Sequence, residues 1–266
     1  MNNNQHSFEG KNIVTGYDKK IIIDGVDITI PSNKISVIIG SNGCGKSTLL
    51  KTLARLIKPI SGDIVIDGKK VTSMPSKQLA KVLGLLPQSP VVPEGITVWD
   101  LVSRGRFPYQ TMLKSMSKED FEAVEEALEI MGITDLANRC VDELSGGQRQ
   151  RVAIARALAN DPAIIMADEP TGNLDSETGL QIIKLLAELS KEKLVIMVTH
   201  NYEQAQDYVT RKVKIHDGEI VLDVAVNTDK RINYKAEQPS DDKNADAGEK
   251  LGNQPKNTQV DLNQKR

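Results

Sequence analysis

The chain has 266 residues, of which 39% are hydrophobic, so it can bury the core of one large domain or two small ones. A net charge of −2 and an aromatic content of 3% exclude the positive field and stacking surfaces of a nucleic-acid-binding protein. Its two cysteines, Cys44 and Cys140, stand far apart and predict neither a disulfide framework nor a metal site.

Short strands are predicted on both sides of a glycine-rich segment near the start of the chain. Ile21–Ile23 and Val26–Ile30 are expected to be strands joined by a tight turn at Asp24-Gly25. Asp63–Ile66 is bracketed by turn residues and predicts another strand. Together these strands indicate an antiparallel β-subdomain.

Residues 40–48 fit a phosphate-binding loop. The apolar run Ile35–Ile39 predicts a buried strand before the loop, and helical spacing from Leu49 to Ile57 predicts a helix after it. Backbone N–H groups and a helix N-terminus then surround the phosphates of a nucleotide, while Lys46 adds a charge and Ser47 offers a hydroxyl to Mg²⁺. A structural glycine turn is the alternative, but the flanking elements favour a nucleotide site made by Gly40, Ser41, Asn42, Gly43, Cys44, Gly45, Lys46, Ser47 and Thr48.

The second half of the chain predicts an α/β core. Ser117–Gly132 and Ser145–Ala159 are expected to be helices, the first with a capping box. Ala163–Ala167 and Leu194–Val198 are continuous apolar runs typical of central parallel strands, and Leu180–Leu189 has the spacing of a crossover helix between them. The fold class is therefore α/β.

The composition changes after Val226. Residues 227–266 are rich in Asp, Lys, Asn, Gln and Glu, which predicts a disordered tail. The tail is expected to be a solvated extension, with partner binding as the lesser alternative. The domain division is then residues 1–226 for a nucleotide-binding domain, with a helical subdomain at about 89–160, and 227–266 for the tail.

Two adjacent carboxylates, Asp168 and Glu169, follow the first predicted buried strand, where open α/β sheets place ligand-handling groups. One can serve Mg²⁺ while the other polarises an attacking water, although two solvated acids are the plainer alternative. His200 follows the other buried strand and could hold Glu169 or a γ-phosphate, or simply cap a helix.

The segment Leu144-Ser145-Gly146-Gly147-Gln148 predicts a second anion site at a helix start. One ATP needs only one such site, so we expect this one to serve the ATP of another copy, with two subunits enclosing two nucleotides head to tail. A helix cap alone would explain Ser145, but it would hardly explain the two glycines and Gln148.

With these motifs in this order, residues 7 to 225 resemble the ATP-binding subunit of an ABC transporter, a P-loop ATPase core. The resemblance implies that Tyr17 stacks on adenine, although this residue could instead simply pack. It implies that Gln88, in Leu86-Pro87-Gln88, senses Mg²⁺ and water, that Asp168 is the magnesium-side carboxylate, that Glu169 is the catalytic base and that His200 is the switch histidine.

The resemblance also implies the cofactors and partners. ATP and Mg²⁺ are expected, with Ser47, Gln88 and Asp168 on the metal and Lys46 among the catalytic residues. Ser145, Gly146, Gly147 and Gln148 match the family's signature, and Asn173-Leu174-Asp175 matches the loop that touches the opposite subunit. A second ATPase subunit, membrane permease subunits and a substrate-binding protein are the implied partners, at the cytoplasmic face of the membrane; the polar N-terminus predicts no signal peptide.

The cargo is predicted from two parts of the chain that disagree. Pro93–Val98 and Gly105–Tyr109 resemble the ATPases of iron-siderophore, haem and cobalamin importers. Asp168–Asp175 and Val198–Glu203 instead resemble the ATPases of lipoprotein-release and macrolide-export systems. We give the first part more weight, because in this family it forms the groove for the permease. Trp99, Arg104 and Arg106 lie there, although the tryptophan could be core and the arginines a solvated face.

We therefore expect an ATPase that powers import of an iron-siderophore or similar chelate. An exporter ATPase is the alternative within the family, and a soluble non-transport ATPase, such as a cluster-assembly component, is the alternative from another class.

Overall fold

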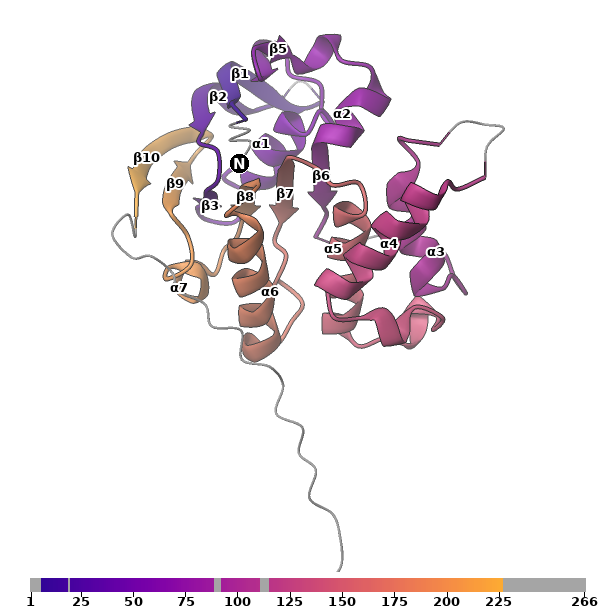
Figure 1. The fold of residues 1–266 in the computed structure, drawn as a ribbon. Helices are drawn as coiled ribbons and strands as arrows, with labels where there is room; N and C mark the ends of the chain where they lie inside the picture. Colours follow the sequence, from indigo (N-terminus) through magenta and orange to yellow (C-terminus); the bar gives the residue numbers. More distant parts are fainter. Residues whose placement is uncertain (1–5, 19, 89–91, 111–114, 227–266) are drawn as a thin grey trace, which may run out of the picture. The chain divides into compact units, whose positions relative to one another are not determined.

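A computed structural model of the chain describes residues 6–18, 20–88, 92–110 and 115–226 (Figure 1). These residues belong to one compact unit. The disordered tail predicted for 227–266 lies outside the described residues, so that expectation stays a prediction.

The first sheet is antiparallel, as the sequence predicts. It has four strands in the order β2-β1-β4-β5. Their bounds are β1 Phe8–Tyr17, β2 Lys20–Ile30, β4 Ser61–Ile66 and β5 Lys69–Lys70. The sheet buries alternate side chains such as Ile13, Ile28 and Ile64 on one face.

The tight turn predicted at Asp24-Gly25 is wrong. Both residues lie inside the continuous strand β2, and Gly25 takes a φ of 67° there. The pairing of β2 with β1 shifts register between Ile13 and Thr15, opposite this point. A glycine with positive φ beside a register shift is a β-bulge, which bends a strand without ending it.

The second sheet is mainly parallel and carries the site. It has six strands in the order β10-β9-β3-β8-β7-β6. Their bounds are β3 Ile35–Ile39, β6 Leu83–Leu86, β7 Ile164–Asp168, β8 Leu194–Val198, β9 Arg211–His216 and β10 Glu219–Ala225. All neighbouring pairs are parallel except β9 with β10, so the predicted α/β core is confirmed.

Two hydrophobic cores cover the two faces of this sheet. Along β7, Ile164 and Met166 point into one core and Ile165 and Ala167 into the other. Helix α1 (Lys46–Leu53) packs in the first core, where it contacts both sheets. Helix α6 (Ser176–Leu189) packs in the second core and makes the crossover from β7 to β8. Burial on both faces explains why β7 and β8 are uninterrupted apolar runs.

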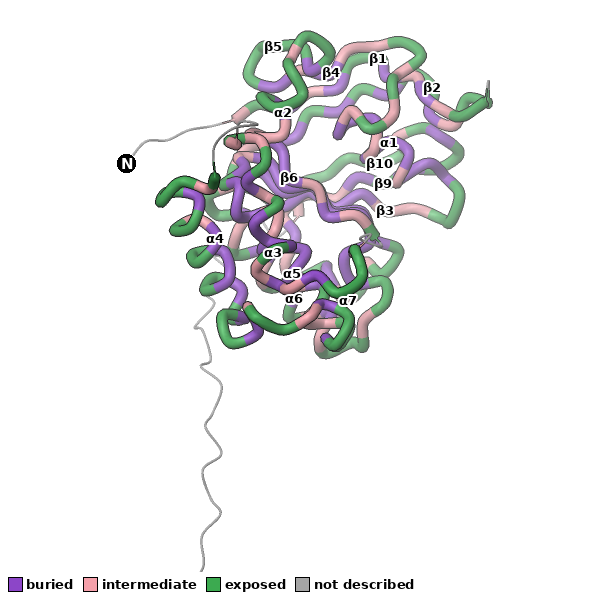
Figure 2. Tube along the Cα trace, turned by 90° about the vertical axis from the view of Figure 1, so that its right-hand side faces the viewer, coloured by how far each residue is buried: buried purple, intermediate pink, exposed green. Residues whose placement is uncertain are grey.

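The remaining helices include three that gather beside the β6 edge in Figure 1: α3 (Val98–Ser103), α4 (Lys118–Ile130) and α5 (Gly146–Leu158). Capping boxes start α4 at Ser117 and α5 at Ser145. Helix α4 alternates between buried and exposed residues along its length in Figure 2. The shorter helices are α2 (Ser76–Val82) and α7 (Tyr202–Ala205). Helices α3, α4 and α5 lie within residues 89–160, the range predicted as a helical subdomain, and the bounds of that subdomain stay a prediction.

In the described part of the chain, none of the helices combines the length and the hydrophobicity that a membrane span requires.

Arg106 is not on a solvated face. It is 8% exposed, its Nε donates to Asp120 Oδ1 at 2.8 Å, and its Nη1 donates to the carbonyl of Ala159 at 2.9 Å. Arg104 is exposed, and the half-buried Trp99 packs against the core and against the ring of Phe121. The buried guanidinium therefore links the segment after α3 to the start of α4 and to the end of α5.

Candidate active site

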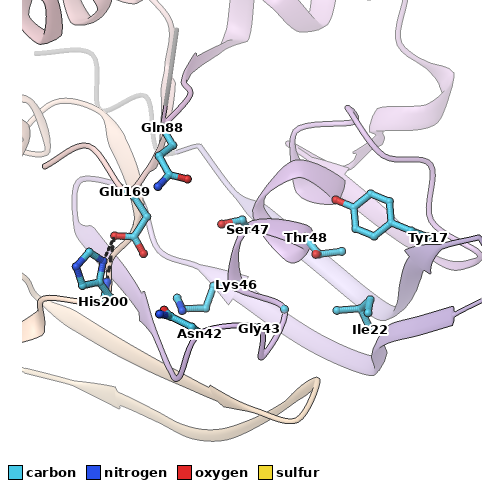
Figure 3. Close-up of a pocket in the computed structure, with 11 residues that line it drawn as sticks. Tyr17, Ile22, Asn42, Gly43, Lys46, Ser47, Thr48, Gln88, Glu169 and His200 are labelled. Atoms are coloured by element: carbon cyan, nitrogen blue, oxygen red, sulfur yellow. Dashed lines mark hydrogen bonds and ion pairs between the residues drawn. The ribbon is translucent and has the colours of Figure 1, made fainter. Parts of the chain in front are cut away.

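An open cavity of about 480 Å³ lies between the glycine-rich loop and the carboxyl ends of β7 and β8. Figure 3 shows Glu169, His200 and Gln88 at one end, Tyr17 at the other and Ser47 between them. The lining residues are Tyr17, Ile22, Asn42, Gly43, Gly45, Lys46, Ser47, Thr48, Gln88, Glu169 and His200. The fold therefore brings together residues that are as far apart in the sequence as 17 and 200.

The loop between β3 and α1 has a backbone that requires glycine. Gly43 and Gly45 have φ values of 82° and 103°, in the left-handed region that other residues avoid. A side chain at Gly45 would also meet Ile23 Cδ1 at 2.6 Å, whereas one at Gly43 would meet no protein atom within 4 Å. The loop is thus packed against β2 at Gly45 and open at Gly43, and both glycines line the cavity, where their backbone can approach an anion.

Lys46 begins α1 and is buried, with 6% exposure. Its Nζ donates to the carbonyls of Gly40 at 3.0 Å and Ser41 at 2.9 Å. Both acceptors are neutral carbonyls, which do not offset the charge of an ammonium group, so the cavity attracts anions near Lys46. Cys44, by contrast, is a buried core residue and does not line the cavity in the structure.

Ser47 and Asp168 bring a hydroxyl oxygen and a carboxylate oxygen into direct contact. Ser47 Oγ donates to Asp168 Oδ1 at 2.6 Å, which joins the start of α1 to the last residue of β7. A hydroxyl and a carboxylate are the hard oxygen donors that Mg²⁺ takes, usually together with water and substrate phosphates. No three His, Cys, Asp or Glu side chains gather as a metal cage anywhere in the described ranges. The residues present therefore fit a magnesium ion that is held jointly with a nucleotide.

Glu169 and His200 form the second pair. Glu169 Oε2 accepts from the His200 backbone N–H at 3.2 Å and lies 2.8 Å from His200 Nδ1. The Glu169 residue is 8% exposed, while its backbone takes a φ of 49°. Such a φ is unfavourable for a glutamate and is typical of functional sites. The sequence expectation that His200 could hold Glu169 is confirmed.

The far end of the cavity is apolar. Tyr17 is 49% exposed, and Ile22 lies near it in Figure 3. Ile22 was missed by the sequence analysis because it stands in an apolar run where any member could face the core. Its position beside Gly45 of the phosphate loop is established only when β2 is folded into its sheet.

The segment Ser145–Gln148 does not line the main cavity. Ser145 Oγ accepts from the Gln148 backbone N–H, and Gln148 Oε1 accepts from that of Ser145. Gly146 lines a separate cavity of about 250 Å³, which shares Gln88 and Glu169 with the first. Within one chain, Ser145 and Gly146 are therefore exposed and Gly147 and Gln148 partly exposed at a helix start, outside the lining of the main cavity.

Asp175 also lies outside the main cavity and caps α6. Its carboxylate accepts from the backbone N–H groups of Thr178 at 2.9 Å and Glu177 at 3.1 Å. The Thr178 N–H is the larger cause that lowers the pKa of this carboxyl below its usual value. The structure thus gives Asp175 a local structural role.

A model of the ABC transporter family matches residues 23–172. The petrobactin import ATP-binding protein FpuD of Bacillus anthracis is 47% identical over 218 residues, which are 81% of this chain and 80% of FpuD. The ferric enterobactin transport ATP-binding protein FepC of Escherichia coli (strain K12) is 43% identical over 214 residues, 80% of this chain and 79% of FepC.

This chain is also similar to solved structures of ABC transporter cassettes. The dimeric structure of MJ0796, a bacterial ABC transporter cassette, is similar with a TM-score of 0.72 and 34% sequence identity. The match covers 82% of this chain and 98% of that chain.

Proposed function

Because this chain belongs to the ABC transporter family, as an ATP-binding subunit that hydrolyses ATP, we propose that it energises the import of a ferric siderophore. The observation that carries the chemistry is that Ser47, Glu169 and His200 line the loop cavity, with Ser47 bonded to the buried Asp168 and Glu169 in contact with His200. The names of FpuD and FepC support import rather than export, and siderophores as the cargo class.

The residues would divide the reaction as follows. Tyr17 stacks on the adenine, the loop from Gly40 to Thr48 binds the phosphates, and Lys46 turns from its loop carbonyls to the β- and γ-phosphates. Ser47 and Asp168 would hold Mg²⁺, and Gln88 would assist from its place in the cavity lining beside Glu169 (Figure 3). When bound, the metal neutralises charge on the phosphate oxygens.

Glu169 acts as the base in this scheme. It accepts a proton from a water molecule that attacks the γ-phosphorus, and the bond to the β-phosphate oxygen breaks to give ADP and inorganic phosphate. His200 keeps the carboxylate oriented through the 2.8 Å contact. Burial of Glu169 beside a neutral amide and an imidazole keeps it aimed into the cavity rather than into bulk water.

The site is completed by a second copy. The start of α5 lies outside the nucleotide cavity of its own chain and can bind an anion. We therefore assign it to the γ-phosphate of ATP bound by the other subunit, with Ser145, Gly146, Gly147 and Gln148 as the contacting residues. Asn173 and Asp175 would lie at the same interface. The dimeric MJ0796 cassette supports such an assembly. In this proposal the chain binds membrane permease subunits, works with a substrate-binding protein and lies on the cytoplasmic face of the membrane.

Uptake measurements test this proposal. A strain that lacks the chain would receive either the wild type or Lys46→Ala, and accumulation of iron-labelled petrobactin and enterobactin would be followed. The wild type should restore uptake of at least one chelate, whereas Lys46→Ala should not, because charge at the transferring phosphoryl is lost. Undiminished uptake of every chelate in the deletion strain, with active purified ATPase, would refute siderophore import while leaving the ATPase assignment standing.

A further inference from the structure

Helix α1 presents two side chains to the same buried carboxylate. Ser47 and Lys51 stand four residues apart and therefore lie on one face of the helix. Ser47 Oγ donates to Asp168 Oδ1 at 2.6 Å, and Lys51 Nζ lies 3.8 Å from Asp168 Oδ2. The two oxygens of Asp168 thus have different partners, a neutral hydroxyl and a cation.

The two members of the Lys51–Asp168 pair differ in exposure. The side chain of Asp168 is 4% exposed, whereas that of Lys51 is 43% exposed. A buried carboxylate needs a nearby positive charge, because its desolvation is costly. Among the described residues, Lys51 is the cation within 4 Å of this carboxylate, since Lys46 donates to the loop carbonyls instead. Lys51 can return to water without a comparable cost.

We propose that Lys51 is a stand-in cation that balances Asp168 before nucleotide binds and opposes the binding of free Mg²⁺ there. Metal would then enter together with a nucleotide, whose phosphates add the negative charge that outweighs Lys51. This inference rests on the proposed magnesium role of Ser47 and Asp168. It assigns to Lys51 a positioning and selecting role, without contact to the reacting atoms.

The expected size follows from the charges. Two opposite unit charges about 4 Å apart attract each other strongly enough to change a binding constant by roughly 5- to 1000-fold, depending on how well water screens them. Displacement of Lys51 by a divalent ion faces the same attraction, and solvent screening of the half-exposed ammonium places the effect at the low end. We expect removal of the charge to tighten free-metal binding about tenfold.

Manganese binding to the nucleotide-free protein, followed by electron paramagnetic resonance, measures this effect. Lys51→Met and Lys51→Gln, which both remove the charge, should bind Mn²⁺ about tenfold more tightly than the wild type. Lys51→Arg should behave as the wild type. Lys58→Met is the matched control, because Lys58 is an exposed lysine beyond the end of α1. Thermal unfolding would verify that each variant is folded.

Equal or weaker Mn²⁺ binding by both Lys51→Met and Lys51→Gln would overturn the inference. Asp168→Asn separates this failure from a failure of the proposed site. If Asp168→Asn weakens Mn²⁺ binding in the presence of ATP while the Lys51 variants match the wild type, only the role of Lys51 is refuted. If Asp168→Asn leaves that binding unchanged, the magnesium role of Asp168 itself is wrong.

Discussion

Replacing Glu169 by glutamine removes the proposed base and almost nothing else. The amide keeps one oxygen that can accept from His200, so the fold should lose at most about 1–2 kcal/mol of hydrogen bonding. Loss of a positioned base slows a reaction by about 10²- to 10⁴-fold, which corresponds to about 3–5 kcal/mol in the barrier. The loss of rate should therefore far exceed any loss of stability or nucleotide affinity.

Phosphate release by the purified chain with its permease measures turnover, and equilibrium binding of a fluorescent ATP analogue measures affinity. Glu169→Gln should bind nucleotide normally, turn over at least a hundredfold more slowly and accumulate an ATP-bound dimer on gel filtration. Glu203→Gln is the matched control, since Glu203 is exposed and does not line the cavity. Wild-type turnover in folded Glu169→Gln would refute the role of the carboxylate as base.

Three further predictions concern other parts of the molecule. Tyr17→Ala should weaken ATP binding by about 1 kcal/mol, or roughly fivefold, with kcat unchanged in saturating ATP, because a stacking contact is lost far from the γ-phosphate; unaltered affinity by calorimetry would argue against stacking. Arg106→Met should lower the free energy of unfolding by about 3–5 kcal/mol in denaturant titrations, because it leaves Asp120 buried without its partner. Burial raises the pKa of Asp120, but the Ser117 N–H and Arg106 outweigh it, so the pKa lies below its ordinary value near 3.8. The stability from this pair is therefore present above about pH 4 and lost as the pH falls through the lower folded pKa, and Arg106→Met should lack that acid-dependent loss. Cys44 should react slowly with a maleimide in the native protein, because it is 4% exposed, and the adduct should abolish ATP binding; full ATPase activity after stoichiometric labelling, verified by mass spectrometry, would contradict this.

Local signals identified the parts of the fold that carry the chemistry. The phosphate loop is bounded by β3, whose predicted bounds Ile35–Ile39 are confirmed, and by a helix that begins at Lys46. Strand β8 was also predicted with its observed bounds, Leu194–Val198. These elements are predictable because a strand buried on both faces leaves a continuous apolar run.

Elements whose conformation depends on distant partners were harder to predict. Strand β1 was not predicted at all, because Gly10, Asn12 and Gly16 interrupt its apolar pattern. Its pairing with both β2 and β4 supplies what the local sequence lacks. For Arg106 the sequence left two alternatives, the permease groove and a solvated face, and its buried partner Asp120 is identified only once α4 is folded beside it.

The left-handed backbone at Glu169 has a consequence for how this protein can evolve. At a φ of 49°, any residue with a Cβ costs about 1 kcal/mol or more relative to glycine. An inactive chain with glycine at position 169 would escape that strain and would no longer bury a carboxylate. Catalysis therefore requires a residue at position 169 that lowers the free energy of unfolding. Selection for stability alone would replace it and remove the base.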